Sequence, residues 1–139
     1  MSTTALHALL YVFKAHSALR YLLLAAALGA ILYYGFSLAT RRSPQSRDRA
    51  LAASFNGLVD LQLTLGIALI LLGRVYPALI GHIVMMIAAA AAAHLGVIVY
   101  RRRRQATLLP LLIGLGSSLL LMVGGILALG RGVLVTTAF

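Results

Sequence analysis

Five ionisable side chains interrupt long apolar stretches of this 139-residue sequence, and their types and spacing could support chemistry. They are His16, Arg20, Asp60, His82 and His94. An ionisable group inside a membrane-length apolar segment is costly to hold there, so each is a functional hypothesis by default. Histidine binds metals through a neutral ring nitrogen, and a nearby carboxyl stabilises its charged form. These residue types therefore indicate two possible kinds of chemistry, cofactor ligation and proton exchange.

Four apolar segments carry or surround these side chains. Crossing about 30 Å of hydrocarbon takes about 20 apolar residues, and segments near 17–39, 51–73, 77–100 and 108–130 reach that length. Each is predicted helical because lipid offers the backbone no hydrogen-bond partner. Their short connections make neighbouring helices antiparallel, so we expect an all-α fold: an integral membrane up-down four-helix bundle, as one domain over residues 1–139.

The composition agrees with a membrane protein. Hydrophobic residues make up 62% and charged residues 10% of the chain, whereas about a quarter of a soluble domain is charged. The net charge of +10 comes mainly from Arg in the gaps between apolar segments. A nucleic-acid binder would spread those cations over one face, so we expect lipid and not nucleic acid as the surroundings. The absence of cysteine excludes disulfides and thiol catalysis.

Charge asymmetry sets the expected orientation. Residues 41–49 and Arg101 to Arg104 form two Arg-rich connections, while Arg74 is the single charge between the second and third segments. Cytoplasmic loops are enriched in Lys and Arg. We therefore expect a multi-pass protein of the bacterial inner membrane, with both chain ends outside. Residues 1–14 form either an outer interfacial helix or an extension of the first span.

Depth along the spans groups four of the ionisable residues into two pairs. At a rise of 1.5 Å per residue, His16 and His82 both fall near the outer leaflet. Two imidazoles from facing helices at one depth suit the iron of a b-type haem, and a four-helix bundle supplies a slot between helices. Arg20, with Lys14 or Arg74, could neutralise the haem propionates. The same histidines could instead be hydrogen-bond partners between helices.

Small side chains along the third span have two possible uses. Gly81, the run from Ala88 to Ala93, and Gly96 could make room for a flat macrocycle or allow close helix packing. Met85 and Met86 lie one turn from His82 and could pad the edge of such a ring. The sequence supports both interpretations.

The inner pair consists of Asp60 and His94, at similar depth in the inner half of their spans. A carboxylate is a poor axial haem ligand, so this pair predicts either a hydrogen bond between helices or a proton-transfer role. A proton or solute pathway through Asp60, His94, Gln62 and Asn56 is a further hypothesis. Only two of these four residues, one acid and one base, can exchange a proton, which is few for such a pathway.

Three motifs in this order resemble those of a family of small four-helix bacterial membrane proteins described as cytochrome b-like. That family opens its first span with His-Ser-Gly-Leu-Arg-Trp, and residues 16–21 here read His-Ser-Ala-Leu-Arg-Tyr. Its second span carries His-x-Gln-Leu, where residues 60–63 read Asp-Leu-Gln-Leu. Its third span carries His-Pro-x-x-Met-Met, and here His82 precedes Met85 and Met86, with His94 twelve residues on.

The resemblance covers roughly residues 16–104 and implies that His16 and His82 are the axial ligands of a haem b. Asp60 stands where the family has a histidine, so the resemblance implies at most one bis-His haem here. It leaves the inner pair, Asp60 and His94, without a ligand role.

Two functions follow as hypotheses. The first is one-electron transfer through a single haem near the outer face, to or from a quinone or a periplasmic carrier. The alternative is a haem-free accessory subunit of a larger respiratory or photosynthetic membrane complex. Glycines of the fourth span could make its contacts: Gly114, Gly116, Gly124 and Gly125. We expect an electron carrier or an accessory subunit more than an enzyme, because no nucleophile constellation or phosphate-cradling loop is present.

Overall fold

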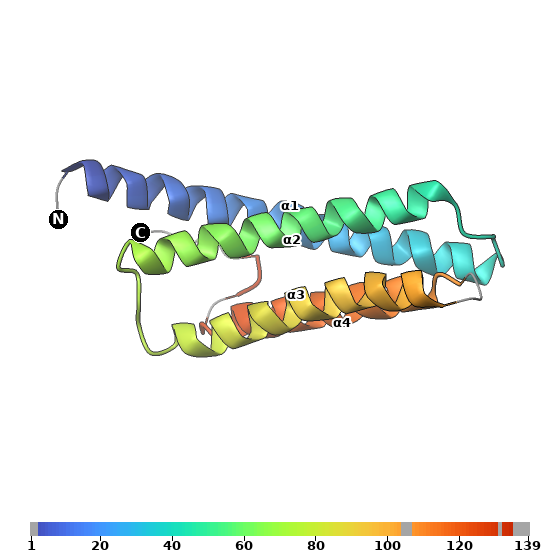
Figure 1. Cartoon of the computed structure of the whole chain (residues 1–139). Helices are drawn as coiled ribbons and strands as arrows, with labels where there is room; N and C mark the ends of the chain where they lie inside the picture. Colours follow the sequence, from blue (N-terminus) through green and yellow to red (C-terminus); the bar gives the residue numbers. More distant parts are fainter. Residues whose placement is uncertain (1–2, 104–106, 131, 135–139) are drawn as a thin grey trace.

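The structure is a computed structural model that describes residues 3–103, 107–130 and 132–134. Four helices follow one another in antiparallel order (Figure 1): α1 (Thr3–Ala39), α2 (Ser46–Leu71), α3 (Leu79–Arg102) and α4 (Leu109–Leu127). All four are long and apolar enough to cross a membrane. The expected all-α, up-down, four-helix membrane bundle is therefore confirmed.

The first helix is longer than the predicted span. It runs without interruption from Thr3 to Ala39, over 37 residues, which corresponds to about 55 Å. Residues before Ser17 thus form one continuous helix with the predicted first span. The first turns of α1 project beyond the end of α2 (Figure 1).

The second helix begins five residues before the predicted start at Leu51. The carboxylate of Asp48 accepts a hydrogen bond from the backbone N–H of Gln45 at 2.6 Å, and this bond satisfies one of the donors that a helix start leaves open. The polar residues from Ser46 to Arg49 therefore join the helix instead of the loop. The predicted third and fourth spans differ from α3 and α4 by two or three residues at each end at most.

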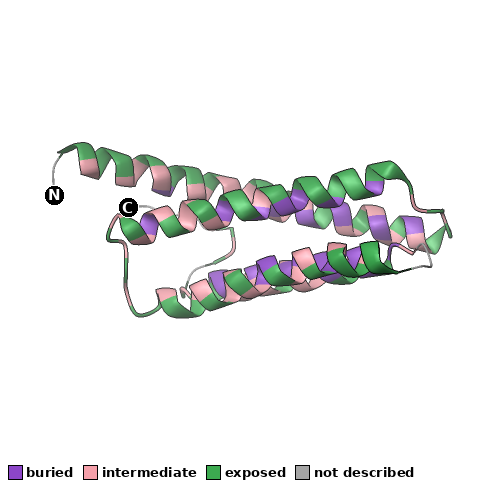
Figure 2. Cartoon of the chain, viewed as in Figure 1, coloured by how far each residue is buried: buried purple, intermediate pink, exposed green. Residues whose placement is uncertain are grey.

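Small residues of α3 pack it closely against α4. A Cβ atom added to Gly96 would lie 2.8 Å from the carbonyl oxygen of Pro110, and one added to Gly114 would lie 2.7 Å from the Cα of Gly96. Ala89 and Ala93 are buried in the same bundle core. Ala89, Ala90, Ala93 and Gly96 are thus packed inside the bundle, the second of the two uses considered for the run, whereas Gly81 and Ala91 are exposed. Buried residues line the inward faces of the helices (Figure 2).

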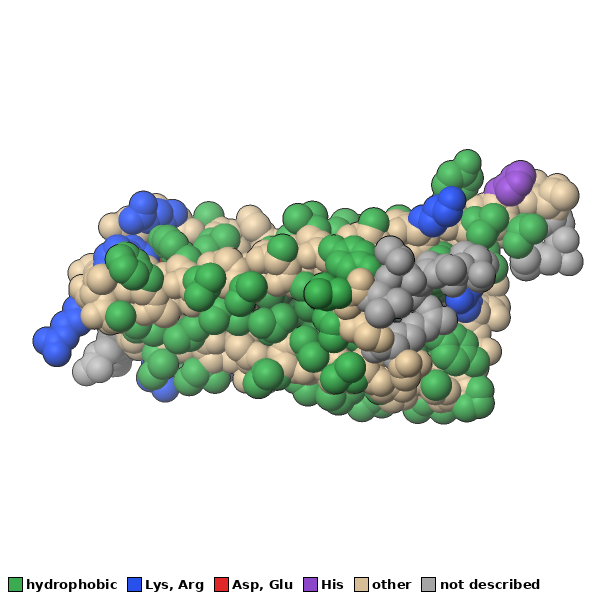
Figure 3. All heavy atoms as spheres, turned by 180° about the vertical axis from the view of Figure 1, so that it is seen from behind, with side chains coloured by type: hydrophobic (Ala, Val, Ile, Leu, Met, Phe, Trp, Pro, Cys, Tyr) green, Lys and Arg blue, Asp and Glu red, His purple; other side chains and the backbone are tan. Residues whose placement is uncertain are grey.

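The helices form two hairpins, α1 with α2 and α3 with α4, that diverge toward one end. The hairpins are closest near the two Arg-rich connections and farthest apart near the connection 72–78 (Figure 1). Arg104, the last residue of the predicted basic run, lies outside the described residues. On one face of the molecule, Lys and Arg gather toward the two ends, and apolar side chains cover the length between them (Figure 3).

Candidate functional site

An apolar cavity of about 240 Å³ lies between the hairpins, in the half of the bundle where they diverge. Side chains from all four helices form its walls. The basic and imidazole groups that line it are His16, Arg20, Arg74 and His82. The apolar wall includes Leu23, Val59, Leu63, Ile70, Met86, Met122 and Ile126. The outer histidine pair predicted from depth therefore faces one common space, and two of the three candidate cations line it as well.

His82 is fixed by a contact between α3 and α4. Its Nδ1 donates a hydrogen bond to the carbonyl oxygen of Gly125 at 2.9 Å. Because this bond uses Nδ1, Nε2 is the ring nitrogen left for a ligand. Space at Gly125 is tight: an added Cβ would lie 2.5 Å from the Cε of Met86 and 3.0 Å from the Cβ of Met85, so these neighbours would have to shift.

His16 is held from α2. The Nε2 amide of Gln62 donates to the backbone carbonyl oxygen of His16 at 3.1 Å and lies 3.4 Å from the Nε2 of its ring. Nδ1 of His16 is buried and has no hydrogen-bond partner among the described residues. One turn beyond Gln62, a Cβ on Gly66 would lie 3.4 Å from the Cε1 of His16.

Gln62 and Gly66 are therefore site residues that the sequence analysis did not assign to this site. Gln62 appeared there in the motif of residues 60–63 and in the pathway with Asp60, without a role beside His16. Their spacing of four residues, which places both on one helix face, is the signal that could have linked them. Gln62 and Asn56 are buried, whereas Asp60 is exposed, so the four members of that pathway do not face one space.

The two cations at the cavity each stack on an aromatic ring. The guanidinium carbon of Arg20 lies 4.5 Å from the ring centre of Tyr21, and its Nη2 donates to the Tyr21 hydroxyl at 2.6 Å. The guanidinium carbon of Arg74 lies 4.3 Å from the ring centre of Phe13. Lys14 is exposed and is not one of the residues that line the cavity.

The residues at the cavity fit a haem in their chemistry. Two imidazoles come from opposite hairpins, and one of them has a buried ring nitrogen that no described residue hydrogen-bonds. Guanidinium groups suit propionates, and the walls are apolar. The described residues hold no cluster of three metal-binding side chains, but a haem iron needs only two protein ligands. The volume is just under the roughly 300–1,000 Å³ typical of ligand sites, so binding requires flexible wall residues such as Met86 to move.

The inner pair lies elsewhere. Nε2 of His94 and Oδ2 of Asp60 are 3.5 Å apart, so the two residues predicted at one depth do meet. Their side chains are 42% and 57% exposed, respectively, on the outer surface between α2 and α3. Neither residue lines the cavity. The pair is therefore a surface feature of the bundle.

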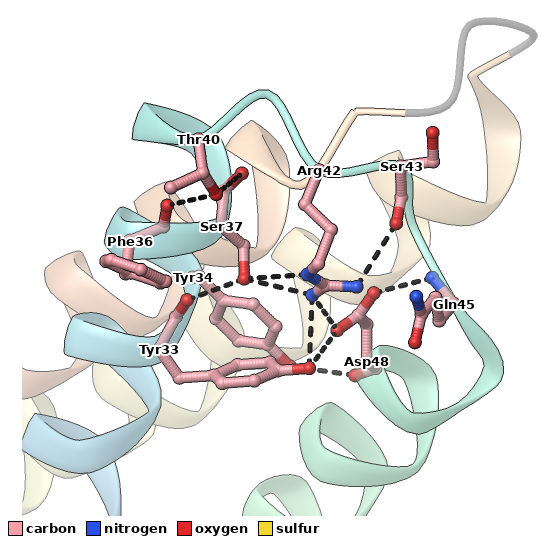
Figure 4. Close-up of polar contacts among 9 residues, drawn as sticks. All are labelled: Tyr33, Tyr34, Phe36, Ser37, Thr40, Arg42, Ser43, Gln45 and Asp48. Carbon is pink, nitrogen blue, oxygen red and sulfur yellow. Dashed lines mark hydrogen bonds and ion pairs between the residues drawn. The ribbon is translucent and has the colours of Figure 1, made fainter.

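A buried polar cluster at the Arg-rich end was not predicted. Asp48 is fully buried, and its Oδ1 accepts hydrogen bonds from Nη2 of Arg42 at 2.7 Å and from the Tyr33 hydroxyl at 2.8 Å (Figure 4). The Tyr34 hydroxyl donates to the backbone oxygen of Asp48 at 2.8 Å. Arg42 also donates to the hydroxyl of Ser37 at 2.9 Å. The cluster ties the end of α1 to the start of α2.

Hydrogen bonding decides the ionisation of Asp48, which lies before the apolar part of α2. Burial alone would raise the pKa of its carboxyl. The hydrogen bonds from Arg42, the backbone of Gln45 and Tyr33 outweigh burial, and the net pKa is below the ordinary value. Asp48 is therefore ionised in this cluster, and its hydrogen bonds are made by the carboxylate. An acidic residue three positions after Gln45, just before an apolar run, was the available sequence signal.

Comparisons with protein-family models, curated protein sequences and solved structures found no match. The geometry of the cavity is therefore what supports a functional proposal.

Proposed function

We propose that this chain is a b-type cytochrome-like membrane protein that binds a single haem between His16 and His82 and transfers single electrons. One observation carries the proposal. His16 and His82, on different hairpins, line the same apolar cavity, and Arg20 and Arg74 line it too. The depth argument selected His16 and His82, and Arg20 and Arg74 are two of the three cations considered for the propionates.

In this proposal each residue has a defined task. His16 and His82 would donate a ring nitrogen to the iron. The bond to the Gly125 carbonyl oxygen orients the ring of His82, and Gln62 bonds the backbone oxygen of His16 and lies 3.4 Å from its ring nitrogen. Arg20 and Arg74 supply positive charge for the propionates. The apolar walls keep water away. A bound haem would supply a one-electron couple whose potential depends on its ligands, nearby charge and burial.

The proposed stoichiometry follows from the inner pair. Asp60 and His94 face outward, away from the cavity, so they do not form a second haem site. The cavity lies toward the connection 72–78, which the charge asymmetry puts on the outer side of a bacterial inner membrane. A quinone in the membrane or a periplasmic carrier would exchange electrons there.

The test is a reduced-minus-oxidised absorption spectrum of the detergent-purified protein, with pyridine haemochrome quantification. We expect a b-type spectrum at about one haem per chain. His16→Ala and His82→Ala should each abolish it. His7→Ala and His94→Ala are matched controls outside the cavity and should retain it. Haem-free protein, purified gently after expression with haem supplied, would overturn the proposal and leave a haem-free accessory subunit as the better account.

A further inference from the structure

The outward-facing pair of Asp60 and His94 is out of place on a lipid-facing surface. Ionisable residues in membrane spans almost always face the bundle interior or a water-filled space, because acyl chains offer them no partner. Here the two side chains are 57% and 42% exposed. Their helix neighbours on the same surface are apolar and exposed, among them Leu61, Ile67, Ile87, Leu95 and Ile98.

The contact within the pair leaves hydrogen-bonding capacity unused in the carboxyl group of Asp60. Nδ1 of His94 lies 3.0 Å from the carbonyl oxygen of Ala90 and donates to it, so Nε2 is the nitrogen that meets Asp60. That contact is 3.5 Å long, at the outer limit for a hydrogen bond. A carboxyl group has two oxygens and can accept several bonds. The exposed side of the pair can therefore take a second polar partner.

Small exposed residues lie beside the pair on both helices. Gly57 lies one turn from Asp60 on the same face and is exposed, and a Cβ added to it would meet no atom within 4 Å. It differs from Gly96 and Gly114, whose lack of a side chain is required inside the bundle. Ala91, one turn from His94, is also exposed. Small residues at membrane helix surfaces let another backbone approach.

We propose that this surface of α2 and α3 binds a second copy of the same chain, related by a two-fold axis along the membrane normal. Rotation about such an axis keeps every atom at its depth. Since Asp60 and His94 are level with each other, Asp60 would meet His94 of the partner subunit, and His94 would meet Asp60 of the partner subunit. An isologous contact of this kind needs one surface that carries both an acid and a base at one depth, as this one does.

Charge complementarity selects a second copy over another occupant. Lipid tails provide neither a donor nor an acceptor, and an unrelated helix would need its own acid and base at matching depth. The surface itself supplies both groups. In the crossed arrangement each carboxyl group would lie beside two imidazoles, and Nε2 of each imidazole would lie between two carboxyl groups, which would remove both side chains from contact with lipid.

The chain has no cysteine, which allows a clean cross-linking test. Thr64 lies one turn from Asp60 and Ala91 one turn from His94, both toward the same end of the bundle and both exposed. Thr64→Cys chains and Ala91→Cys chains, with different tags, would be co-expressed and oxidised in the native membrane. We expect a disulfide that joins the two tags. In the matched control, Leu120→Cys on α4 replaces Thr64→Cys. Leu120 is 75% exposed, and we expect little disulfide between the two tags in this pair.

A second measurement tests the polar contacts themselves. Dimer dissociation in liposomes would be followed by energy transfer between labelled chains over a range of protein-to-lipid ratios. Asp60→Asn should weaken association by about tenfold, whereas Leu120→Asn should not. A wild-type chain that stays monomeric at every ratio, or equal cross-linking at Leu120, would overturn the proposal. Haem content is expected to be the same in the Asp60→Asn protein, so the outcome is independent of the proposed cofactor.

Discussion

Nδ1 of His82 on α3 donates a hydrogen bond to the backbone carbonyl oxygen of Gly125 on α4, 2.9 Å away. The bond fixes the orientation of the ring that faces the cavity. Position 125 has little room for a side chain, because the Cε of Met86 and the Cβ of Met85 lie beside it. A glycine of the fourth helix is thus part of the site although it offers no side-chain chemistry.

Gly125→Ala should therefore damage the site. The new methyl group would press on Met86 and Met85, at 2.5 and 3.0 Å, and we expect a loss of about 1–3 kcal/mol in the free energy of unfolding. Haem content should fall with it, because the displaced Met86 side chain lines the same cavity. Gly116→Ala on the same helix is the control: its Cβ would meet nothing within 4 Å. Equal haem content and thermal stability in both variants would contradict this account.

Gln62→Leu tests the support of His16. The substitution removes the amide that donates to the His16 carbonyl oxygen at 3.1 Å and keeps a side chain of similar size. Loss of a group that orients a metal ligand typically lowers affinity about 10- to 100-fold. We expect that loss in a haem titration of the apoprotein. Thr64→Val, which removes a bond that Thr64 makes to its own helix, should leave haem affinity unchanged.

Arg20→Gln should lower the reduction potential of the proposed haem. A positive charge favours the state that has gained an electron, so its removal favours the oxidised state. For charges about 10 Å apart and an effective dielectric constant of about 20, the shift is on the order of 70 mV. A spectroelectrochemical titration would measure it. Arg20→Lys keeps the charge and should stay near the wild-type potential; an equal fall in both variants would exclude a charge effect.

The cluster around Asp48 should make stability depend on acid. The folded pKa of Asp48 is depressed, so the native state binds fewer protons than the unfolded one near pH 4. The stabilisation is therefore present above about pH 4 and is lost as the pH falls through the folded pKa. Thermal unfolding in detergent, followed by circular dichroism between pH 7 and pH 2, would show this decline.

Asp48→Asn should remove most of that acid dependence. Its free energy of unfolding at pH 7 should be lower by about 2 kcal/mol, because the charged partner of the hydrogen bonds is lost. Arg41→Ala, in the same connection but exposed, provides the control and should keep the wild-type pH profile. An unchanged profile in Asp48→Asn would assign the acid dependence to another group.

The sequence predicted what depends on distance along a helix and missed what depends on rotation about its axis. Apolar run lengths predicted the four helices, and the rise per residue put His16 level with His82 and Asp60 level with His94. Whether a pair faces inward or outward is decided by how the helices pack. The cavity at His82 and the lipid-facing surface at Asp60 could therefore not be told apart in advance.

Asp48 and Gln62 were missed for a related reason. Asp48 stands in a basic connection that reads as an exposed loop, and its burial depends on Tyr33, Tyr34 and Arg42 folding over it. Gln62 lies two residues from Asp60 and therefore points to a different side of α2, toward His16. Both roles arise from contacts between segments that one-dimensional spacing does not encode.

The divergence of the two hairpins gives the chain unequal cross-sections in the two leaflets of a bilayer. The leaflet around the connection 72–78 surrounds a wider body than the leaflet around the Arg-rich connections (Figure 1). A tapered inclusion of this kind couples to the lateral pressure profile and to the curvature of the membrane. Lipid packed around the wider end would press on the hairpins, so the surrounding membrane would help to set the width of the space that His16 and His82 line.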